Sequence, residues 1–407
     1  MPKRKLGMNV YDAAVDRINW TFDNFEKIYL SFSAGKDSTV MLHMVMDEAK
    51  RRDRKIAVLF IDWECQISLT IDFARRMLDQ YKDHIIPYWV ALPMKTWNAC
   101  SQYEPEWTAW DTKKKDLWVR QPDPMSITDP KFFPFYYDPM PFEEFVPAFA
   151  EWYAEGDKCA CLVGIRADES LNRFRAIARG DKPTLDGKKW TTLVGGNTWN
   201  VYPIYDWHST DIWTYFAKHE KPYNRLYDRM YQAGVKLSQM RICEPFGDEA
   251  RKGLWLYQVV DPQMWAKVCL RAAGANSGAL YSNEKGAVMG NHHIALPEGH
   301  TFQSFAMHLL NTMPPKTAEH YKNKLAVYFK WWAERGYPDG IPDHVEAKLE
   351  AMGKVPSWRK VVKTFLKNDY WCKGLGFSPT KTSAYKRYVE LSKKRRKEWG
   401  LFDEFSE

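Results

Sequence analysis

The sequence lacks paired cysteines and long apolar stretches. None of its 7 cysteines stands in a Cys-x-x-Cys pattern, and their irregular spacing excludes a disulfide framework. No run of about 18 apolar residues occurs, so we expect no membrane-spanning helix. The basic residues at positions 3–5 are not followed by an apolar segment, so we expect no secretory signal. These absences predict a cytoplasmic protein with reduced thiols.

The bulk composition leaves the partner open. The 407 residues carry a net charge of +8, which suits either nucleic acid or an anionic nucleotide. We expect most of the 19 tryptophans and 22 tyrosines in the core, where aromatic rings bury large areas, although some could stack on bases. The length predicts two domains, or one domain with a large extension, and the hydrophobic content of 45% makes a sizeable core available.

The N-terminal part of the chain alternates between strand and helix patterns. Short apolar runs predict strands at 28–33, 55–62 and 84–92, and apolar positions at helical spacing predict helices at 38–52 and 68–81. The continuous apolar run at 55–62 is typical of a parallel strand that is buried on both faces. This order predicts an α/β fold with a doubly wound parallel sheet.

Residues 93–141 interrupt the alternation and are rich in proline and aromatic residues. We interpret them as an aromatic-rich insertion that packs over the carboxyl edge of the sheet. The pattern then resumes, with expected helices at 142–156 and 209–219 and expected strands at 158–165 and 198–204. We assign residues 1–270 to one domain, 271–300 to a mobile loop, and 301–407 to a mostly helical, basic C-terminal domain. The helices expected in the C-terminal domain are 301–312, 317–335, 357–369 and 383–399.

One strand-to-helix junction carries a pattern suited to phosphate. The segment Ser33-Ala-Gly-Lys-Asp-Ser-Thr39 joins the first strand to the first helix. The amides of such a loop and the positive end of the helix dipole face a bound anion. Gly35 lets the backbone come close, and Lys36 adds a positive charge. Hydroxyl donors stand at Ser33, Ser38 and Thr39. The Walker A spacing is absent, and the alternative is an ordinary strand-to-helix turn with a Ser/Asp cap.

Further segments stand where an open α/β sheet binds ligands, at the carboxyl ends of strands. Asp62 ends the second strand, and Leu162-Val-Gly-Ile-Arg-Ala-Asp-Glu-Ser170 is another strand-to-helix junction. A charge at the end of a buried strand needs a partner of opposite sign, so Arg166 in that junction points to an anion. The last two segments are Tyr202-Pro-Ile-Tyr-Asp-Trp-His-Ser-Thr-Asp-Ile-Trp213 and Lys221-Pro-Tyr-Asn-Arg-Leu-Tyr227.

These segments resemble one family. Residues 33–38 resemble the PP-loop, S-G-G-x-D-S, of the ATP-pyrophosphatase and adenine nucleotide alpha-hydrolase superfamily, with Ala34 in place of the first glycine. Residues 202–213 resemble the P-L-x-D-W-T-x-x-D-V-W segment of phosphoadenosine-phosphosulfate (PAPS) reductases and of the ATP sulfurylase small subunit. Residues 221–227 are similar to the turn that follows it there, so the resemblance covers 25–245. The whole-chain pattern is similar to an uncharacterised PAPS-reductase-like branch that includes the immunoglobulin-binding regulator A (IbrA) proteins.

The resemblance implies a site for ATP or a related adenine nucleotide, with Mg²⁺ and with metal ligands left open. Catalytic roles would fall to Lys36, Asp37 and Arg166. Nucleotide binding would use Ser33, Gly35, Lys36, Asp37, Ser38, Thr39, Asp62, Gly164, Arg166, Glu169 and Arg173, and Arg175 could reach an anionic group. The alternatives are that Asp168 and Glu169 complement a helix dipole and that the two arginines at 173 and 175 form a solvated face.

The sequence departs from the reductases at its cysteines. Their catalytic E-C-G-x-H signature is absent, and Cys372 stands instead in Tyr-Trp-Cys-Lys-Gly. The paired cysteines of iron–sulfur reductases are absent too, so we expect no iron–sulfur cluster. Cys159 and Cys161 share one face of a strand and are interpreted as core residues; alternatively, they ligate a metal or cluster together with Cys243. We interpret the remaining candidate ligands as loop histidines, namely His292, His293 and His300.

The end of the chain carries the run Lys393-Lys-Arg-Arg-Lys397, with Lys381, Lys386 and Arg387 nearby. It indicates either contact with nucleic-acid phosphates or a solvated helix face. The first functional hypothesis is an enzyme that cleaves or transfers at the α-phosphate, in sulfur transfer or nucleic-acid modification. The second is a catalytically silent, nucleotide-dependent regulator that binds DNA or a partner protein. The missing signature disfavours a genuine PAPS reductase.

Overall fold

The structure is a computed structural model. It describes residues 7–101, 104, 106–178, 182–242, 244–247, 253–276, 296–313, 315–346, 349–350, 355–366 and 369–377. The chain divides into two compact units. The first comprises Met1–Thr96, Thr108–Pro245 and Gly253–Ala272, and the second comprises Trp97–Trp107, Phe246–Lys252 and Ala273–Glu407.

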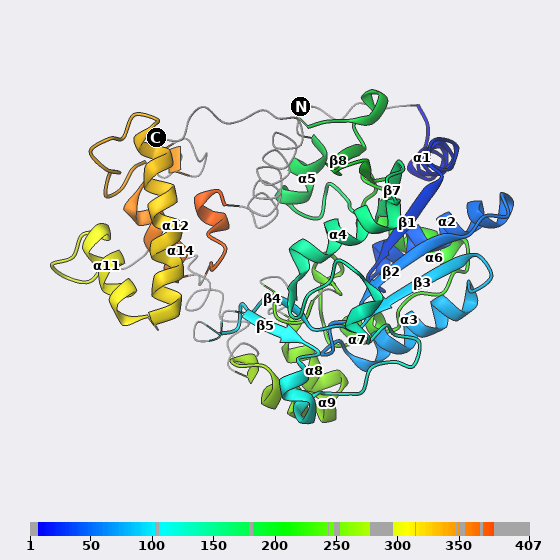
Figure 1. Cartoon of the computed structure of the whole chain (residues 1–407), viewed down its shortest axis with the longest axis horizontal. Coiled ribbons are helices and arrows are strands. Elements are labelled where there is room, and N and C mark those ends of the chain that lie inside the picture. Colours follow the sequence, from blue (N-terminus) through cyan, green and yellow to red (C-terminus); the bar gives the residue numbers. More distant parts are fainter. Residues whose placement is uncertain are drawn as a thin grey trace. The chain divides into compact units, whose positions relative to one another are not determined.

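A six-stranded sheet forms the centre of the first unit (Figure 1). Its order is β3-β2-β1-β7-β9-β8. The strands are β1 (Lys27–Phe32), β2 (Ile56–Ile61), β3 (Ile85–Val90), β7 (Cys159–Val163), β8 (Thr191–Gly195) and β9 (Thr198–Val201). All neighbouring pairs are parallel except β8 with β9, which are antiparallel. The predicted doubly wound parallel sheet is therefore confirmed, with one antiparallel edge strand, β8, that the sequence patterns did not indicate.

The central strands β1, β2 and β7 are buried on both faces because they are apolar on both sides. Alternate residues of β1, such as Leu30 and Phe32, belong to the same core cluster as Val40 and Val45 of helix α2 (Lys36–Arg51). Tyr29 faces the other way, and its ring centroid lies 5.3 Å from that of Phe149 in helix α4 (Phe142–Ala154). Helices therefore cover both faces, as βαβ crossovers require.

The first unit contains seven further helices among the described residues. They are α1 (Val10–Asn24), α3 (Ser68–Gln80), α5 (Leu171–Ala178), α6 (Ser209–Lys218), α7 (Leu226–Gln232), α8 (Trp255–Val260) and α9 (Pro262–Arg271). The insertion contains the short strands β4 (Met94–Trp97), β5 (Glu106–Ala109) and β6 (Met140–Pro141), which form a sheet of order β5-β4-β6. It also contains two 3₁₀ turns, Thr112–Leu117 and Pro130–Phe132.

The second unit is mostly helical, as predicted for the C-terminal region. Helix α11 (Phe302–Thr312) packs against α12 (Pro315–Ala333) and α14 (Trp358–Leu366). The buried core includes Tyr321, Val361 and Phe365. The helix predicted at 383–399, the basic run within it and most of the predicted loop at 271–300 lie outside the described residues.

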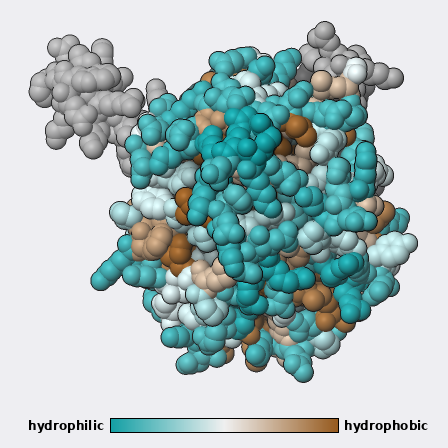
Figure 2. All heavy atoms as spheres, turned by 90° about the vertical axis from the view of Figure 1, so that its right-hand side faces the viewer, coloured by the Kyte–Doolittle hydropathy of each residue, from teal (hydrophilic) through white to brown (hydrophobic). Residues whose placement is uncertain are grey.

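Two further properties bear on function, namely the polarity of the surface and the character of the helices. Figure 2 shows a face that is mostly hydrophilic, with hydrophobic residues in small separate groups. In the described ranges, none of the helices combines the length and the apolar character that crossing a bilayer demands.

Candidate functional site

The loop between β1 and α2 is held by its own hydroxyl groups. The Oγ atoms of Ser33 and Ser38 lie 3.0 Å apart. Ser38 Oγ and Thr39 Oγ1 donate to the carbonyl oxygen of Gly35 at 3.1 and 2.8 Å, and Gly35 is the N-cap of α2. The hydroxyls predicted to meet phosphate therefore also fix the turn that presents the first amides of the helix.

Ala34 is the position where the loop departs from the PP-loop pattern. Its φ of +58° lies in the left-handed region, which explains why a glycine suits this position. The alanine methyl group is fully buried in the core of the unit. Burial of a methyl stabilises by about 0.8 kcal/mol, which offsets most of the cost of about 1 kcal/mol that this backbone conformation imposes on alanine.

Lys36, the first residue of α2, is buried with its charge. Its Nζ lies 3.0 Å from Asp37 Oδ2 and donates to the carbonyl oxygen of Met240 at 3.3 Å. Its backbone N–H donates to the hydroxyl of Tyr227, on α7, at 2.9 Å. The hydroxyl oxygen of Tyr227 therefore accepts from one of the backbone amides that we expected to bind phosphate.

Gly164, just after β7, lies directly against the start of α2. A Cβ built on it would come within 3.0 Å of the carbonyl carbon and oxygen of Asp37 and of the amide nitrogen of Ser38. Contacts this short are tighter than nearly all real Cβ contacts, so the backbone at the start of α2 would have to give by a few tenths of an ångström to admit a side chain. The two glycine junctions predicted from sequence thus meet at one point of the carboxyl edge.

Arg166 joins the two junctions electrostatically. Its Nε donates to Asp37 Oδ1 and its Nη1 to Asp168 Oδ1, each at 2.5 Å, and only 4% of its side chain is exposed. Burial disfavours the guanidinium charge, but pairing with Asp37 and then Asp168 outweighs it, so the pKa of Arg166 is raised. Asp168 Oδ2 in turn lies 3.2 Å from Nδ1 of His208.

Glu169 and Arg173, both predicted to bind the nucleotide, pair with each other. Arg173 Nη1 lies 2.7 Å from Glu169 Oε2, one helical turn away. Arg241 also donates to the carbonyl oxygen of Glu169 at 2.8 Å. The side chain of Arg175 lies outside the described part of the chain.

Asp62, at the end of β2, is fully buried and has three donors. It accepts from Trp89 Nε1 at 2.8 Å and from the amide of Glu64 at 2.9 Å, and it pairs with Arg120 of the insertion. These bonds show that Asp62 ties the insertion to the carboxyl edge. A second buried pair, Glu64 with Arg271 at 2.7 and 2.8 Å, ties the end of α9 to the same edge and was not anticipated from the sequence.

Cys159 and Cys161 of the first unit have the environment of core residues. Burial raises the pKa of the Cys159 and Cys161 thiols on β7 to about 12 each. Cys372, in the second unit, is also buried, and burial raises its pKa to about 12. Within the described residues, no group of three His, Cys, Asp or Glu side chains is placed to hold a metal. Three predicted candidates lie outside those residues: Cys243, His292 and His293.

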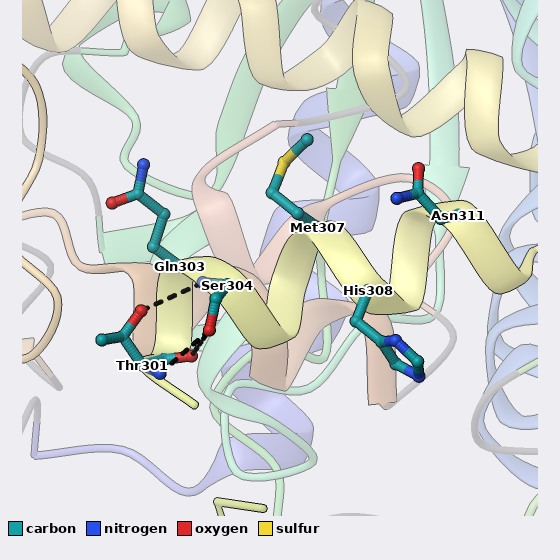
Figure 3. Close-up of a pocket in the computed structure, with 6 residues that line it drawn as sticks. All are labelled: Thr301, Gln303, Ser304, Met307, His308 and Asn311. Carbon is teal, nitrogen blue, oxygen red and sulfur yellow. Dashed lines mark hydrogen bonds between the residues drawn. The ribbon is translucent and has the colours of Figure 1, made fainter. Parts of the chain in front are cut away.

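A hollow of about 540 Å³ lies over α11 in the second unit (Figure 3). Thr301 caps the helix, and its Oγ1 accepts from the amide of Ser304 at 3.1 Å. The hollow contains none of the residues predicted for the nucleotide. Its lining residues all come from α11 and its cap: Thr301, Gln303, Ser304, Met307, His308 and Asn311.

His208 is the residue of this site that sequence reasoning missed. It is the N-cap of α6 and stands where the P-L-x-D-W-T-x-x-D-V-W segment has threonine. A histidine in place of that threonine was the signal available in the sequence.

Residues 27–233 match the family described as the phosphoadenosine phosphosulfate reductase domain. Residues 234–339 and 337–386 match a family described as a domain of unknown function, DUF3440.

The chain is 48% identical to the uncharacterized protein YbdN of Escherichia coli K12 over 402 residues, which are 98% of both chains. It is 23% identical over 244 residues to adenosine 5'-phosphosulfate reductase of Halalkalibacterium halodurans, which covers 60% of this chain and 86% of that enzyme. A solved structure of PAPS reductase from Candida auris is 15% identical with a TM-score of 0.31, over 56% of this chain and 93% of that one.

Proposed function

We propose that this chain binds ATP or a related adenine nucleotide at the loop 33–39 and acts on the α-phosphate. The chain belongs to the phosphoadenosine phosphosulfate reductase domain family, as its motifs predicted. The observation that carries this proposal is the meeting of two cations at the start of α2. Lys36 and Arg166 come from different junctions, each has 4% of its side chain exposed, and both contact Asp37.

The physical reason is charge neutralisation. Phosphate oxygens bound at the helix start would meet the loop amides, the helix dipole and two buried cations, in surroundings where electrostatic interactions are strong. Asp37 and Asp168 balance these cations. Bound phosphate would share Lys36 and Arg166 with the two carboxylates.

We propose that Mg²⁺ enters with the nucleotide and shares carboxylates that are paired with Lys36, Arg166 and His208. Asp37 and Asp168 offer the carboxylate oxygens that Mg²⁺ takes together with substrate phosphates, and they would hold it beside the nucleotide. The ion would supply further charge neutralisation. We assign the protein's own part of the chemistry to positioning by the loop and to Lys36, Asp37 and Arg166.

The proposed reaction is attack of an acceptor on the α-phosphorus with departure of pyrophosphate, in sulfur transfer or in modification of a nucleic acid. We do not propose reduction of PAPS. The E-C-G-x-H signature is absent from the sequence, and Cys372 is buried with a raised pKa. A thiol of that kind is a poor nucleophile at neutral pH.

Calorimetry with ATP, AMP, adenylyl-sulfate and PAPS tests nucleotide binding. Replacing Asp37 and Ser38 with alanine should abolish binding. The variant should also melt at a lower temperature than the parent, because Asp37 balances the buried charges of Lys36 and Arg166, so binding is compared well below that melting temperature. Replacing Ser170, which lies near the site but only caps α5, serves as the matched control. Equal affinity of the double variant and the parent would remove the loop from the proposal.

The alternative is a nucleotide-dependent regulator that has no turnover, and the sequence feature that favours it is the basic run at 393–397. Neutralising its five residues should weaken binding to DNA or RNA and lower the salt slope by about one unit per lost phosphate contact. Pyrophosphate release from ATP separates the two functions. Release supports the enzyme, and nucleotide binding without release, together with salt-dependent DNA binding, supports the regulator.

A further inference from the structure

The hydroxyl group of Tyr227, on α7, lies on a donor of the loop 33–39. Its oxygen accepts from the backbone N–H of Lys36 at 2.9 Å and lies 3.4 Å from the point where a Cβ on Gly35 would stand. Lys36 is the first residue of α2, so its N–H is one of the amides at the helix start that have no partner within the helix. Amides of this kind bind phosphate at helix N-termini. The hydroxyl oxygen of Tyr227 therefore stands where we expect a phosphate oxygen.

The segment that carries Tyr227 is packed firmly against this loop. Asn224 is fully buried, and its Nδ2 donates to the carbonyl oxygen of Ala34 at 3.2 Å and to Thr70 Oγ1 at 3.1 Å. Tyr227 is itself buried, and its ring meets that of Trp213 edge to face, with 5.4 Å between the ring centroids. Buried contacts therefore fix the position of the hydroxyl, as they do for the rest of the segment.

The side-chain donor of Lys36 is also met by the chain itself. Its Nζ donates to the carbonyl oxygen of Met240 at 3.3 Å and pairs with Asp37 at 3.0 Å, and the residue is buried. Oxygen atoms from two distant parts of the chain, Tyr227 and Met240, therefore lie on the two donors of Lys36 that a phosphate would use.

We propose that Tyr227 controls the access of phosphate to the loop, because its hydroxyl holds the Lys36 amide until a phosphate oxygen takes its place. This inference rests on the proposed function above, since it concerns the same loop. A buried N–H needs an acceptor at all times, and the hydroxyl supplies one that is uncharged. A hydrogen bond to a charged oxygen is about twice as strong as one between neutral groups, so phosphate can displace the hydroxyl. Tyr227 thereby makes the loop selective for ligands that bring a charged oxygen to this amide.

Removing the hydroxyl should strengthen phosphate binding. In the parent, part of the free energy of binding is used to separate the hydroxyl from the Lys36 amide. In Y227F the ring keeps its packing against Trp213, but the amide loses the hydroxyl oxygen as acceptor, and a bound phosphate would restore one. We therefore expect Y227F to bind ATP roughly tenfold more tightly than the parent and to melt at a lower temperature when no ligand is added. A hydroxyl that only completes the turn would lower the melting temperature without raising the affinity.

Calorimetry with ATP and with adenosine measures this change in the full chain. Adenosine has no phosphate, so Y227F should show no gain with it. The matched control is Y223F. Tyr223 stands on the same segment, and its ring also packs against Trp213, at 5.5 Å between centroids, but its hydroxyl donates to Asp228 at 2.8 Å within that segment. Y223F should therefore keep the ATP affinity of the parent.

The two proposals fail in different ways. Binding of ATP by Y227F that is equal to or weaker than that of the parent overturns the role of Tyr227 and leaves the nucleotide site standing. An equal gain in Y223F, or an equal gain of Y227F with adenosine, also overturns it. If ATP, AMP, adenylyl-sulfate and PAPS all fail to bind both the parent and Y227F, the proposed function and this inference are overturned together.

Discussion

Replacing Gly164 with alanine tests the close packing on which the site depends. The new Cβ would meet three backbone atoms of Asp37 and Ser38 at 3.0 Å, and backbone cannot move aside as the end of a flexible side chain can. Overpacking of this kind typically costs about 1–3 kcal/mol. We expect G164A to lower the free energy of unfolding by that amount, because either β7 or the start of α2 must shift.

The same shift should weaken nucleotide binding. The displaced atoms belong to Asp37 and to the amides at the helix start. We therefore expect ATP affinity to fall roughly tenfold, which corresponds to about 1.4 kcal/mol of binding free energy. Urea denaturation measures the first effect and calorimetry the second.

The control for Gly164 is Gly195. A Cβ on Gly195, at the end of β8, meets nothing within 4 Å. G195A should change stability by no more than about 1 kcal/mol and leave ATP affinity unchanged. A G164A variant with the stability and affinity of the parent would refute the reasoning that the two glycine junctions are locked together.

Three further predictions concern groups away from the phosphate loop. Burial lowers the pKa of His43 to about 4, so below pH 6.5 the unfolded chain binds more protons than the folded protein. The free energy of unfolding should therefore fall by about 3 kcal/mol as the pH drops from 6.5 to 4. Denaturation of H43Q across this range should lack that share of the fall. R271M leaves the buried Glu64 carboxylate without its guanidinium partner, so the free energy of unfolding should fall by about 3–5 kcal/mol. Adding E64Q should recover part of this loss. An R271M variant as stable as the parent would contradict the role of the buried pair. Cys159 and Cys161, whose pKa values are raised to about 12 by burial, should resist iodoacetamide at pH 8 in the folded protein and react after denaturation, as mass spectrometry can show.

The strands and helices around the site could be predicted because each has a local cause. The apolar run of β2 and the helical spacing in α2 and α3 fixed the order of elements, and the ends observed differ from those predicted by no more than a few residues. The antiparallel strand β8 was missed because it is short, ends in glycine and has only one of its five residues buried. It is formed by pairing with β9, which is a tertiary contact.

Sequence alone determined the fold class, the family and the two glycine junctions, because these depend on periodicity and on residues that a tight turn or a close approach requires. Only the tertiary structure decided the partners of the charged side chains. It turned Asp62 toward Trp89 and Arg120, paired Glu169 with Arg173, and placed His208 beside Asp168, 40 positions away in the chain. The physical reason is that a buried charge takes whichever opposite charge the packing brings within reach, and packing between distant segments leaves no local pattern in the sequence.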